Sequence, residues 1–245
     1  MDVVHVDKAH MMRRLFSGAP LQYDGLLSRL TLRSDSTWRQ SVIEASKLEA
    51  NAFVLDVATG TGLMAYDFAN QLNGEGLVVG LDLCEPMLRK GQKNLTSDRK
   101  KVVNFVEGRA EALPFIDGCF HCATITLALR NVTEPAATFE EMSRVVRKGG
   151  YVVSMDFSRP PNRIFARLYS FHIFNVLPFI GWFVSHEWKE IFEYLAGSIK
   201  RSMDPDAIGN LMRVVGLSNV NVRRLSMGIV AVVKGMKPTG SSSAD

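Results

Sequence analysis

The sequence of 245 residues has few cysteines: Cys84, Cys119 and Cys122. Three cysteines cannot form a disulfide framework, so we expect a reducing, cytoplasmic compartment. Cys119 and Cys122 have the spacing of a metal-ligand pair, but no second pair of ligands lies elsewhere in the sequence. We therefore predict no metal site and interpret Cys122 as a core residue.

Long hydrophobic runs are also lacking. The longest, residues 173–184, is interrupted by Pro178 and Gly181. It is too short to span a bilayer, although it can line an apolar pocket or touch a membrane surface. Acids and bases interrupt the first ten residues, so we expect no signal segment. Peripheral association is the only membrane attachment that these features leave open.

No strong excess of one charge is present, since 29 Lys and Arg face 25 Asp and Glu. The pI is about 9.0. One stretch gathers basic residues, namely Arg89, Lys90, Lys93, Arg99, Lys100 and Lys101. No aromatic residues interleave with them, so we predict no nucleic-acid binding. A solvated helix and loop is the favoured interpretation, and attraction to an anionic membrane surface is the alternative.

The most informative stretch, residues 54–62, reads VLDVATGTG and predicts a buried strand that ends in a glycine turn before a helix. A second apolar stretch, residues 78–82, predicts a strand that ends at Asp82. Together they predict a nucleoside-binding half-site. Gly60 and Gly62 let the backbone approach a ligand closely, because no Cβ intervenes. Asp82 would accept hydrogen bonds from the two ribose hydroxyls.

Two ligands compete for this half-site. The spacing Gly60-x-Gly62-x-x-Ala65 also fits a dinucleotide fingerprint. Asp56 argues against it, because a carboxylate close to a pyrophosphate would be repulsive. The same carboxylate would help to hold the α-ammonium of S-adenosylmethionine, directly or through water. The methyl donor is therefore favoured.

Apolar strands and amphipathic helices alternate through the middle of the chain. This pattern predicts an α/β, doubly wound, Rossmann-like fold with a seven-stranded, mostly parallel sheet whose last strand is antiparallel. Strands are expected at 52–57, 77–81, 102–106, 120–127, 151–157, 220–225 and 228–233; helices are expected at 63–72, 85–95, 136–146 and 206–215. Gly149 and Gly150 are expected to stop the helix at 136–146, and Asp204 to cap the helix at 206–215.

Three segments flank or interrupt this core, which we place at residues 51–236. Residues 1–50 are expected to form a helical cap beside the ligand site. Residues 159–201 are helical and unusually aromatic, which suggests a lid over a large apolar substrate. The polar tail, residues 237–245, is expected to be disordered.

With these pieces placed, the chain resembles the ubiquinone/menaquinone biosynthesis C-methyltransferases, a family of class I S-adenosylmethionine-dependent methyltransferases. The matching segments are 54–62, 110–115, 129–133, 144–150, 156–160, 176–181 and 194–199. The segments at 129–133, 176–181 and 194–199 are the most particular to quinone methyltransferases. The resemblance implies S-adenosylmethionine as cofactor and carbon methylation of a prenylated quinol, which is a lipophilic substrate. A homodimer is left open.

The resemblance also implies positions for the methyl donor. Tyr23 belongs to a Tyr-Asp pair that folds over the donor. Thr61 and Asp82 contact it, Arg109 and Ala110 border the adenine, and Thr126 lies near the sulfonium. This chain departs from the family at Leu63, where an acid is usual, at Arg109, where Asp or Asn is common, and at 25–30, where an Asn is usual.

Arg130 and Asn131 follow the strand at 120–127, where the ligand should lie. Arg cannot readily lose its proton, so we predict that Arg130 stabilises the quinol phenolate and that Asn131 binds a ring oxygen. Asp156 ends the next strand and is a candidate base or a structural residue. His172 and His186 are weaker candidates. Alternatives are methylation of another lipophilic molecule, a non-catalytic donor-binding subunit of a quinone-synthesis assembly and, last, a nicotinamide oxidoreductase.

Overall fold

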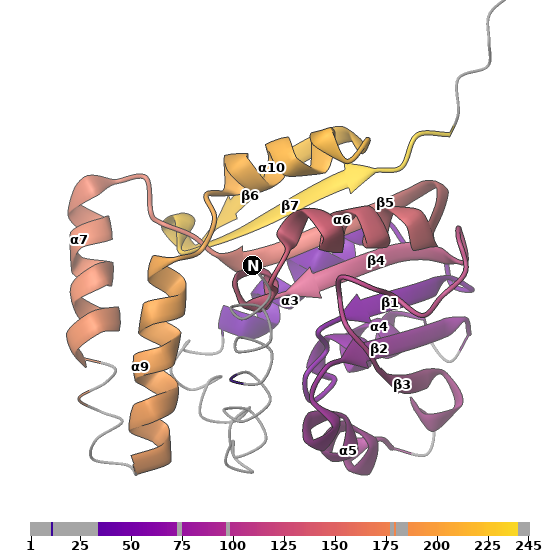
Figure 1. Ribbon diagram of the computed structural model, residues 1–245, viewed down its shortest axis with the longest axis horizontal. Helices are drawn as coiled ribbons and strands as arrows, with labels where there is room; N and C mark the ends of the chain where they lie inside the picture. Colours follow the sequence, from indigo (N-terminus) through magenta and orange to yellow (C-terminus); the bar gives the residue numbers. More distant parts are fainter. Residues whose placement is uncertain are drawn as a thin grey trace, which may run out of the picture.

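The computed structural model describes residues 34–72, 75–96, 99–176 and 186–239, together with Met11 and Phe179; the side chains of Lys100 and of residues 186–191 are excepted. These residues build one twisted sheet with helices on both faces (Figure 1). The expected tail beyond residue 239 and the cap before residue 34, Met11 apart, lie outside the described residues.

The sheet has seven strands in the order β3-β2-β1-β4-β5-β7-β6. The strands are β1 (Phe53–Val57), β2 (Leu77–Asp82), β3 (Val103–Glu107), β4 (Phe120–Thr126), β5 (Val146–Phe157), β6 (Ser218–Leu225) and β7 (Val230–Met236). β7 runs antiparallel to both neighbours, β5 and β6. The pairs from β3 to β5 are parallel. The predicted doubly wound sheet with an antiparallel last strand is thus confirmed.

Helices cover the two faces with separate cores. On one face, α3 (Ser34–Ser46) and α4 (Leu63–Gln71) bury Trp38, Val42 and Phe68, with α5 (Glu85–Asn94) packed against β2 and β3. On the other face, α6 (Pro135–Val145) and α10 (Pro205–Val214) bury Phe139 and Met212. Central strands are buried on both sides, which explains their nearly continuous apolar sequences.

Local sequence signals explain some helix boundaries and mislead at others. The Asp204 side chain accepts a hydrogen bond from the backbone N–H of Asp206 at 2.9 Å, so the predicted cap of α10 is confirmed. The predicted glycine stop after α6 was wrong. That helix ends at Val145, and Gly149 and Gly150 lie inside β5. Gly149 adopts φ 78° where the β4–β5 register shifts, so the glycines serve an irregular strand instead of a helix end.

The aromatic insertion contains α7 (Arg163–Phe171), the π-helix η3 (His172–Val176) and α9 (His186–Lys200). These helices stand at one end of the sheet (Figure 1). α9 contacts the short helix η2 (Leu129–Asn131), which follows β4. Within the described part of the chain, no helix is long and apolar enough to cross a membrane.

Candidate active site

The site begins at the turn between β1 and α4. Three residues of this turn have positive φ: Ala58 at 54°, Gly60 at 58° and Gly62 at 85°. Glycine adopts this left-handed region without steric cost, because it has no Cβ. The N–H of Thr59 donates to the carbonyl oxygen of Leu81 at 3.0 Å, which ties the turn to the end of β2. The turn therefore lines a pocket at the carboxyl edge of the sheet, as expected for this topology.

Asp82 closes the turn from the end of β2. One carboxylate oxygen accepts from the N–H of Gly60 at 2.8 Å, and the other accepts from the N–H of Cys84 at 2.8 Å. Burial raises the pKa of this carboxyl, and the backbone N–H bonds oppose that rise. A carboxylate has about four lone-pair sites. The backbone N–H groups of Gly60, Cys84 and Leu83 use at most three of them, so at least one remains for a ligand. Asp82 lines the pocket and suits a pair of ribose hydroxyls.

Asp56 lies beneath the same turn and is fully buried. Its two oxygens accept from the hydroxyls of Thr59, at 2.6 Å, and Thr124, at 3.0 Å. Burial raises its pKa to about 7, against the hydrogen bonds from these threonines. The side chain thus braces β1, β4 and the turn from below the pocket floor.

The loop between β3 and β4 forms another wall, through Gly108, Arg109, Ala110 and Glu111. Arg109 is 47% exposed, and its Nε lies 3.6 Å from a Glu111 carboxylate oxygen. Glu111 also accepts a hydrogen bond from the N–H of Thr133 at 2.9 Å. This bond joins the loop to the segment that follows η2, so two walls of the pocket are fixed to each other.

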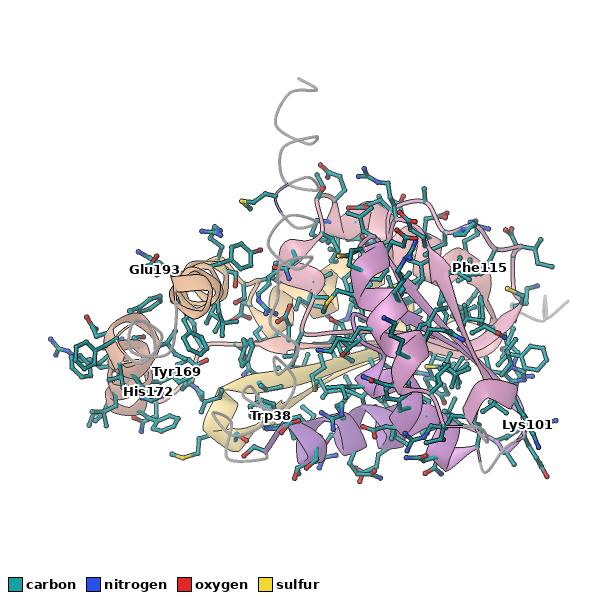
Figure 2. All side chains as sticks on the ribbon, turned by 90° about the horizontal axis from the view of Figure 1, so that it is seen from below. Trp38, Lys101, Phe115, Tyr169, His172 and Glu193 are labelled. Carbon is teal, nitrogen blue, oxygen red and sulfur yellow. The ribbon has the colours of Figure 1, made fainter. Side chains whose placement is uncertain are left out.

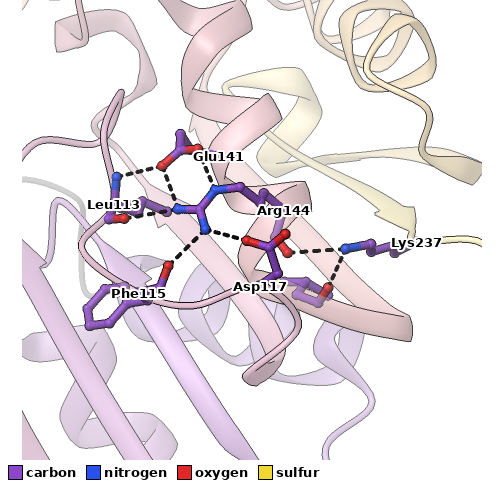
Figure 3. Close-up of polar contacts among 7 residues, drawn as sticks. Leu113, Phe115, Asp117, Glu141, Arg144 and Lys237 are labelled. Atoms are coloured by element: carbon purple, nitrogen blue, oxygen red, sulfur yellow. Dashed lines mark hydrogen bonds and ion pairs between the residues drawn. The ribbon is translucent and has the colours of Figure 1, made fainter.

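Arg144 of α6 clamps the same loop (Figure 3). Its guanidinium donates to the carbonyl oxygens of Leu113, at 3.0 Å, and Phe115, at 2.8 Å. It also binds the carboxylates of Glu141, at 2.6 Å, and Asp117, at 2.7 Å. Glu141 in turn accepts from the N–H of Leu113 at 2.7 Å. Two of the family segments, 110–115 and 144–150, therefore meet in one hydrogen-bonded network.

Arg130 occupies the opposite wall, on η2. Its guanidinium contacts the carboxylate of Asp156 and the carbonyl oxygen of Leu127, and its side chain is 6% exposed. The Arg130 N–H also donates to Asp156, at 3.1 Å. The guanidinium carbon lies 5.1 Å from the centre of the Phe157 ring. Arg130 lines the pocket with its orientation set on several sides.

Asp156 is already heavily engaged. One oxygen accepts from the Arg130 guanidinium and from the N–H of Phe157 at 2.8 Å, while the other accepts from the Arg130 N–H. This carboxylate is 4% exposed. Its geometry is that of a counter-ion to Arg130, which agrees with the structural alternative that the sequence left open.

Two residues of α9 support the Arg130–Asn131 pair, and neither was among the residues predicted from the sequence. The hydroxyl of Tyr194 donates to the side-chain oxygen of Asn131 at 2.8 Å. The Nε of Arg130 donates to the hydroxyl of Ser198 at 3.2 Å. Both belong to the family segment 194–199, four residues apart on one helix face. That spacing was the available signal.

The other residues predicted from the sequence lie in several parts of the molecule. Thr61 and Thr126 line the pocket. Tyr23 and the segment 25–30 lie outside the described residues, as does the side chain of His186. His172 is exposed on η3. Cys122 is fully buried, as its core interpretation predicts. Among the residues that the structure describes, no three His, Cys, Asp or Glu side chains gather into a metal-binding cluster.

One continuous pocket includes both halves of the site. The donor half consists of the glycine turn, Asp82 and the β3–β4 loop, and the other half contains Arg130 and Asn131. Met155, Phe157 and Leu195 contribute apolar wall. The residues present fit S-adenosylmethionine: a carboxylate that can still accept from a ribose, a glycine turn, and a mostly apolar space that extends to Arg130.

Comparison with known proteins gives a family. The model of the ubiE/COQ5 methyltransferase family matches residues 4–237. The ubiquinone/menaquinone biosynthesis C-methyltransferase UbiE of Pseudomonas putida is 34% identical over 239 residues, which cover 97% of this chain and 93% of that protein. The protein of the same name from Enterobacter sp. is 34% identical over 96% of this chain and 94% of its own length.

Solved structures share the fold at low identity. A SAM-dependent methyltransferase from Aquifex aeolicus superposes with a TM-score of 0.60 at 16% identity, covering 81% of this chain and 88% of that one. Phosphoethanolamine N-methyltransferase 2 of Haemonchus contortus, in complex with S-adenosyl-L-methionine, gives 0.59 at 13% identity, covering 82% and 52%. By its family match and its relatives, the chain belongs to the ubiE/COQ5 methyltransferase family and is an S-adenosylmethionine-dependent methyltransferase.

Proposed function

We propose that the protein methylates a ring carbon of a prenylated quinol, of the demethylmenaquinol or 2-polyprenyl-6-methoxy-benzoquinol type. The observation that carries this proposal is the braced Arg130–Asn131 pair, which shares one pocket with Asp82. The relatives' name, ubiquinone/menaquinone biosynthesis C-methyltransferase, supports the same reaction.

Carbon methylation requires an electron-rich ring, so the phenolic oxygen must carry negative charge when the carbon attacks. Arg130 supplies a fixed positive charge for that oxygen. Nη1 and Nε already hold Leu127, Asp156 and Ser198, and the described residues provide no partner for Nη2. We assign Nη2 to the phenolate. Because Arg keeps its proton, water that Arg130 orients takes up the phenolic proton before the attack and the ring proton after it.

Asn131 complements this contact. Its side-chain oxygen accepts from Tyr194, which turns the amide nitrogen toward a second acceptor. We propose that this nitrogen donates to the other ring oxygen. Two oriented hydrogen-bond donors would fix the plane of the ring and select the ring carbon that faces the methyl donor. We propose that Asp156 positions Arg130 by pairing with it.

On the donor side, we propose that Asp82 binds the ribose and that Gly60, Thr61 and Gly62 pack against the amino-acid moiety. We place Arg109 and Ala110 at the adenine and Thr126 near the sulfonium, and the family resemblance adds Tyr23 to the residues that bind the donor. Asp56 supports the turn from below and reaches the α-ammonium only through water. Bound S-adenosylmethionine would supply the methyl group as an electrophilic sulfonium. The attack of the ring carbon disperses charge, so the apolar wall of the pocket favours it.

The test is a methyl-transfer assay with labelled S-adenosylmethionine and reduced short-tail naphthoquinol and benzoquinol acceptors. Label is expected on a ring carbon of one acceptor. Arg130→Ala should lower kcat by about 10² or more, since loss of a hydrogen-bond donor that stabilises transition-state charge has effects of this size. Its affinity for S-adenosylmethionine should stay near that of the wild type. Arg89→Ala is the matched control, because Arg89 is exposed and pairs with Glu85 on the surface of α5.

Absence of transfer to both quinols, together with tight donor binding, would refute quinol methylation. Transfer to a different lipophilic acceptor would then support the alternative substrate. A variant at Arg130 that keeps full kcat would refute the assigned role of the guanidinium, whichever acceptor is used.

A further inference from the structure

The outer face of α7 carries large apolar side chains that the described structure leaves uncovered. Ile164, Leu168 and Phe171 are 76%, 63% and 62% exposed. Their spacing of four and three residues places them on one side of the helix. The helix turns Tyr169 toward the core on its other side. Single apolar residues scattered over a protein surface are normal, but three on one face of a short helix form a continuous apolar patch.

α7 is a capped helix although much of its surface is exposed. Asn162 caps it by accepting from the N–H groups of Ile164 and Phe165, both at 3.0 Å. None of its nine residues is fully buried. A helix this short gains little stability by itself, so a covering partner would contribute to it. It stands beside α9 at the outer end of the molecule, as Figure 1 shows.

The charge of α7 and of the chain around it in sequence is one-sided. Arg163 and Arg167 are exposed and flank the apolar side chains. No acid occurs between residues 157 and 186, a stretch of 30 residues, although 25 acids in 245 residues would give about three. An apolar helix face that arginines border, on a stretch of chain without acids, is suited to the surface of an anionic bilayer.

We propose that this α7 face, formed by Ile164, Leu168 and Phe171 with Arg163 and Arg167, docks the protein on an anionic lipid membrane. The choice of a membrane rests on the proposed function, because a prenylated quinol is dissolved in the bilayer. Docking there would bring α7 and α9, whose neighbour η2 carries Arg130, close to the leaflet that holds the substrate.

The experiment is co-sedimentation of the full-length protein with vesicles of phosphatidylcholine alone or with 30% phosphatidylglycerol. The wild-type protein should bind the anionic vesicles and lose binding in high salt. Combined Ile164→Ser, Leu168→Ser and Phe171→Ser should weaken binding at least tenfold. Combined Arg163→Gln and Arg167→Gln should weaken binding to anionic vesicles by about fivefold for each arginine.

The matched control is Ile116→Ser. Ile116 is 78% exposed, and its neighbour Phe115 lies at the opposite end of the molecule from Tyr169 of α7 (Figure 2). This variant should bind vesicles like the wild type. Donor affinity measured by calorimetry should be unchanged in every variant, which shows that each variant is folded.

Two results would overturn the proposal. One is a serine variant that sediments with vesicles as the wild type does. The other is a wild-type dimer that the serine variant dissociates, without vesicle binding, which would assign the face to a second copy. Methylation of a short-tail acceptor in vesicle-free buffer tests the proposed reaction separately from docking. If the protein transfers the methyl group but does not bind vesicles, only the docking proposal is refuted. If it binds vesicles but does not transfer the methyl group, only the proposed reaction is refuted.

Discussion

At the scale of single residues, the carboxylates of the pocket have become chemically distinct through their surroundings. Asp82 keeps lone pairs at the pocket surface, while Asp156 has used its own on Arg130 and the backbone. Asp56 is enclosed between two threonine hydroxyls, and its desolvation outweighs their hydrogen bonds. Placement at a strand end therefore does not define the role of an acid, because burial and partners decide it.

Asp56 gives a pH prediction. Its folded pKa of about 7 exceeds the ordinary value of 3.8. The folded state thus holds a proton that the unfolded state releases, and stability falls as pH rises from about 4 to about 7. The full cost above pH 7 is on the order of 4 kcal/mol. Asp56→Asn should remove this cost, so its stability relative to wild type should increase between pH 5 and pH 8 in urea unfolding. Parallel pH profiles would contradict this.

Tyr194 offers a second test at this scale. Tyr194→Phe removes the donor to Asn131 and should lower kcat about tenfold, a change that corresponds to one hydrogen bond of about 1.4 kcal/mol. Donor KM should not change, because the donor half of the pocket is untouched. Tyr151→Phe, on β5 beside Lys47 and Lys234, is the matched control. A rise of about tenfold in the donor KM would instead indicate a general structural effect of the substitution.

At the scale of elements, the pocket depends on contacts between segments that are far apart in the chain. The β3–β4 loop is held by α6, and η2 is held by α9. Lys237, after β7, donates to the carbonyl oxygens of Arg144 and Val146, at 3.1 and 2.8 Å, and so fixes the end of α6. Loops placed in this way can present side chains with little freedom.

The Arg144 clamp makes the prediction at this scale. Arg144→Met should release the β3–β4 loop, raise donor KM about tenfold and leave kcat within about threefold, because Arg130 lies on the other wall. Loss of these hydrogen bonds should cost about 2–3 kcal/mol, or about 5–10 °C in Tm. Arg147→Met, an exposed arginine on β5, is the control. Unchanged donor KM in Arg144→Met would show that the loop holds its shape without the clamp.

The elements also show what sequence can predict here. The strands were recognised because buried parallel strands are continuous apolar runs, and the turn at Gly60 because its glycines precede a helix. Gly149 was misassigned because a glycine at a helix end and a glycine in a bulge give the same local signal. The contacts of Tyr194 and Ser198 span 63 and 68 residues. Only the placement of α9 against η2 reveals them.

At the scale of the whole molecule, the pocket lies where the strand order reverses. β1 pairs with β2 on one side and with β4 on the other, so crossover segments diverge and leave a crevice at the carboxyl edge. The donor half follows β1, β2 and β3, while Arg130 lies on η2 after β4 and Asp156 lies on β5. The pocket lining therefore comes from both sides of the reversal, and a donor bound in it should stabilise the molecule as a unit.

Donor binding should accordingly raise the unfolding temperature. S-adenosylmethionine at about 100 times its Kd adds about 2.7 kcal/mol, which corresponds to about 5–10 °C for a protein of this size. Asp82→Ala removes the carboxylate assigned to the ribose and should abolish most of this shift at the same concentration. Asp206→Ala is the control, because Asp206 pairs with Arg224 on the surface. A full shift in Asp82→Ala would show that the donor is held without Asp82, and the assignment of the half-site would then be wrong.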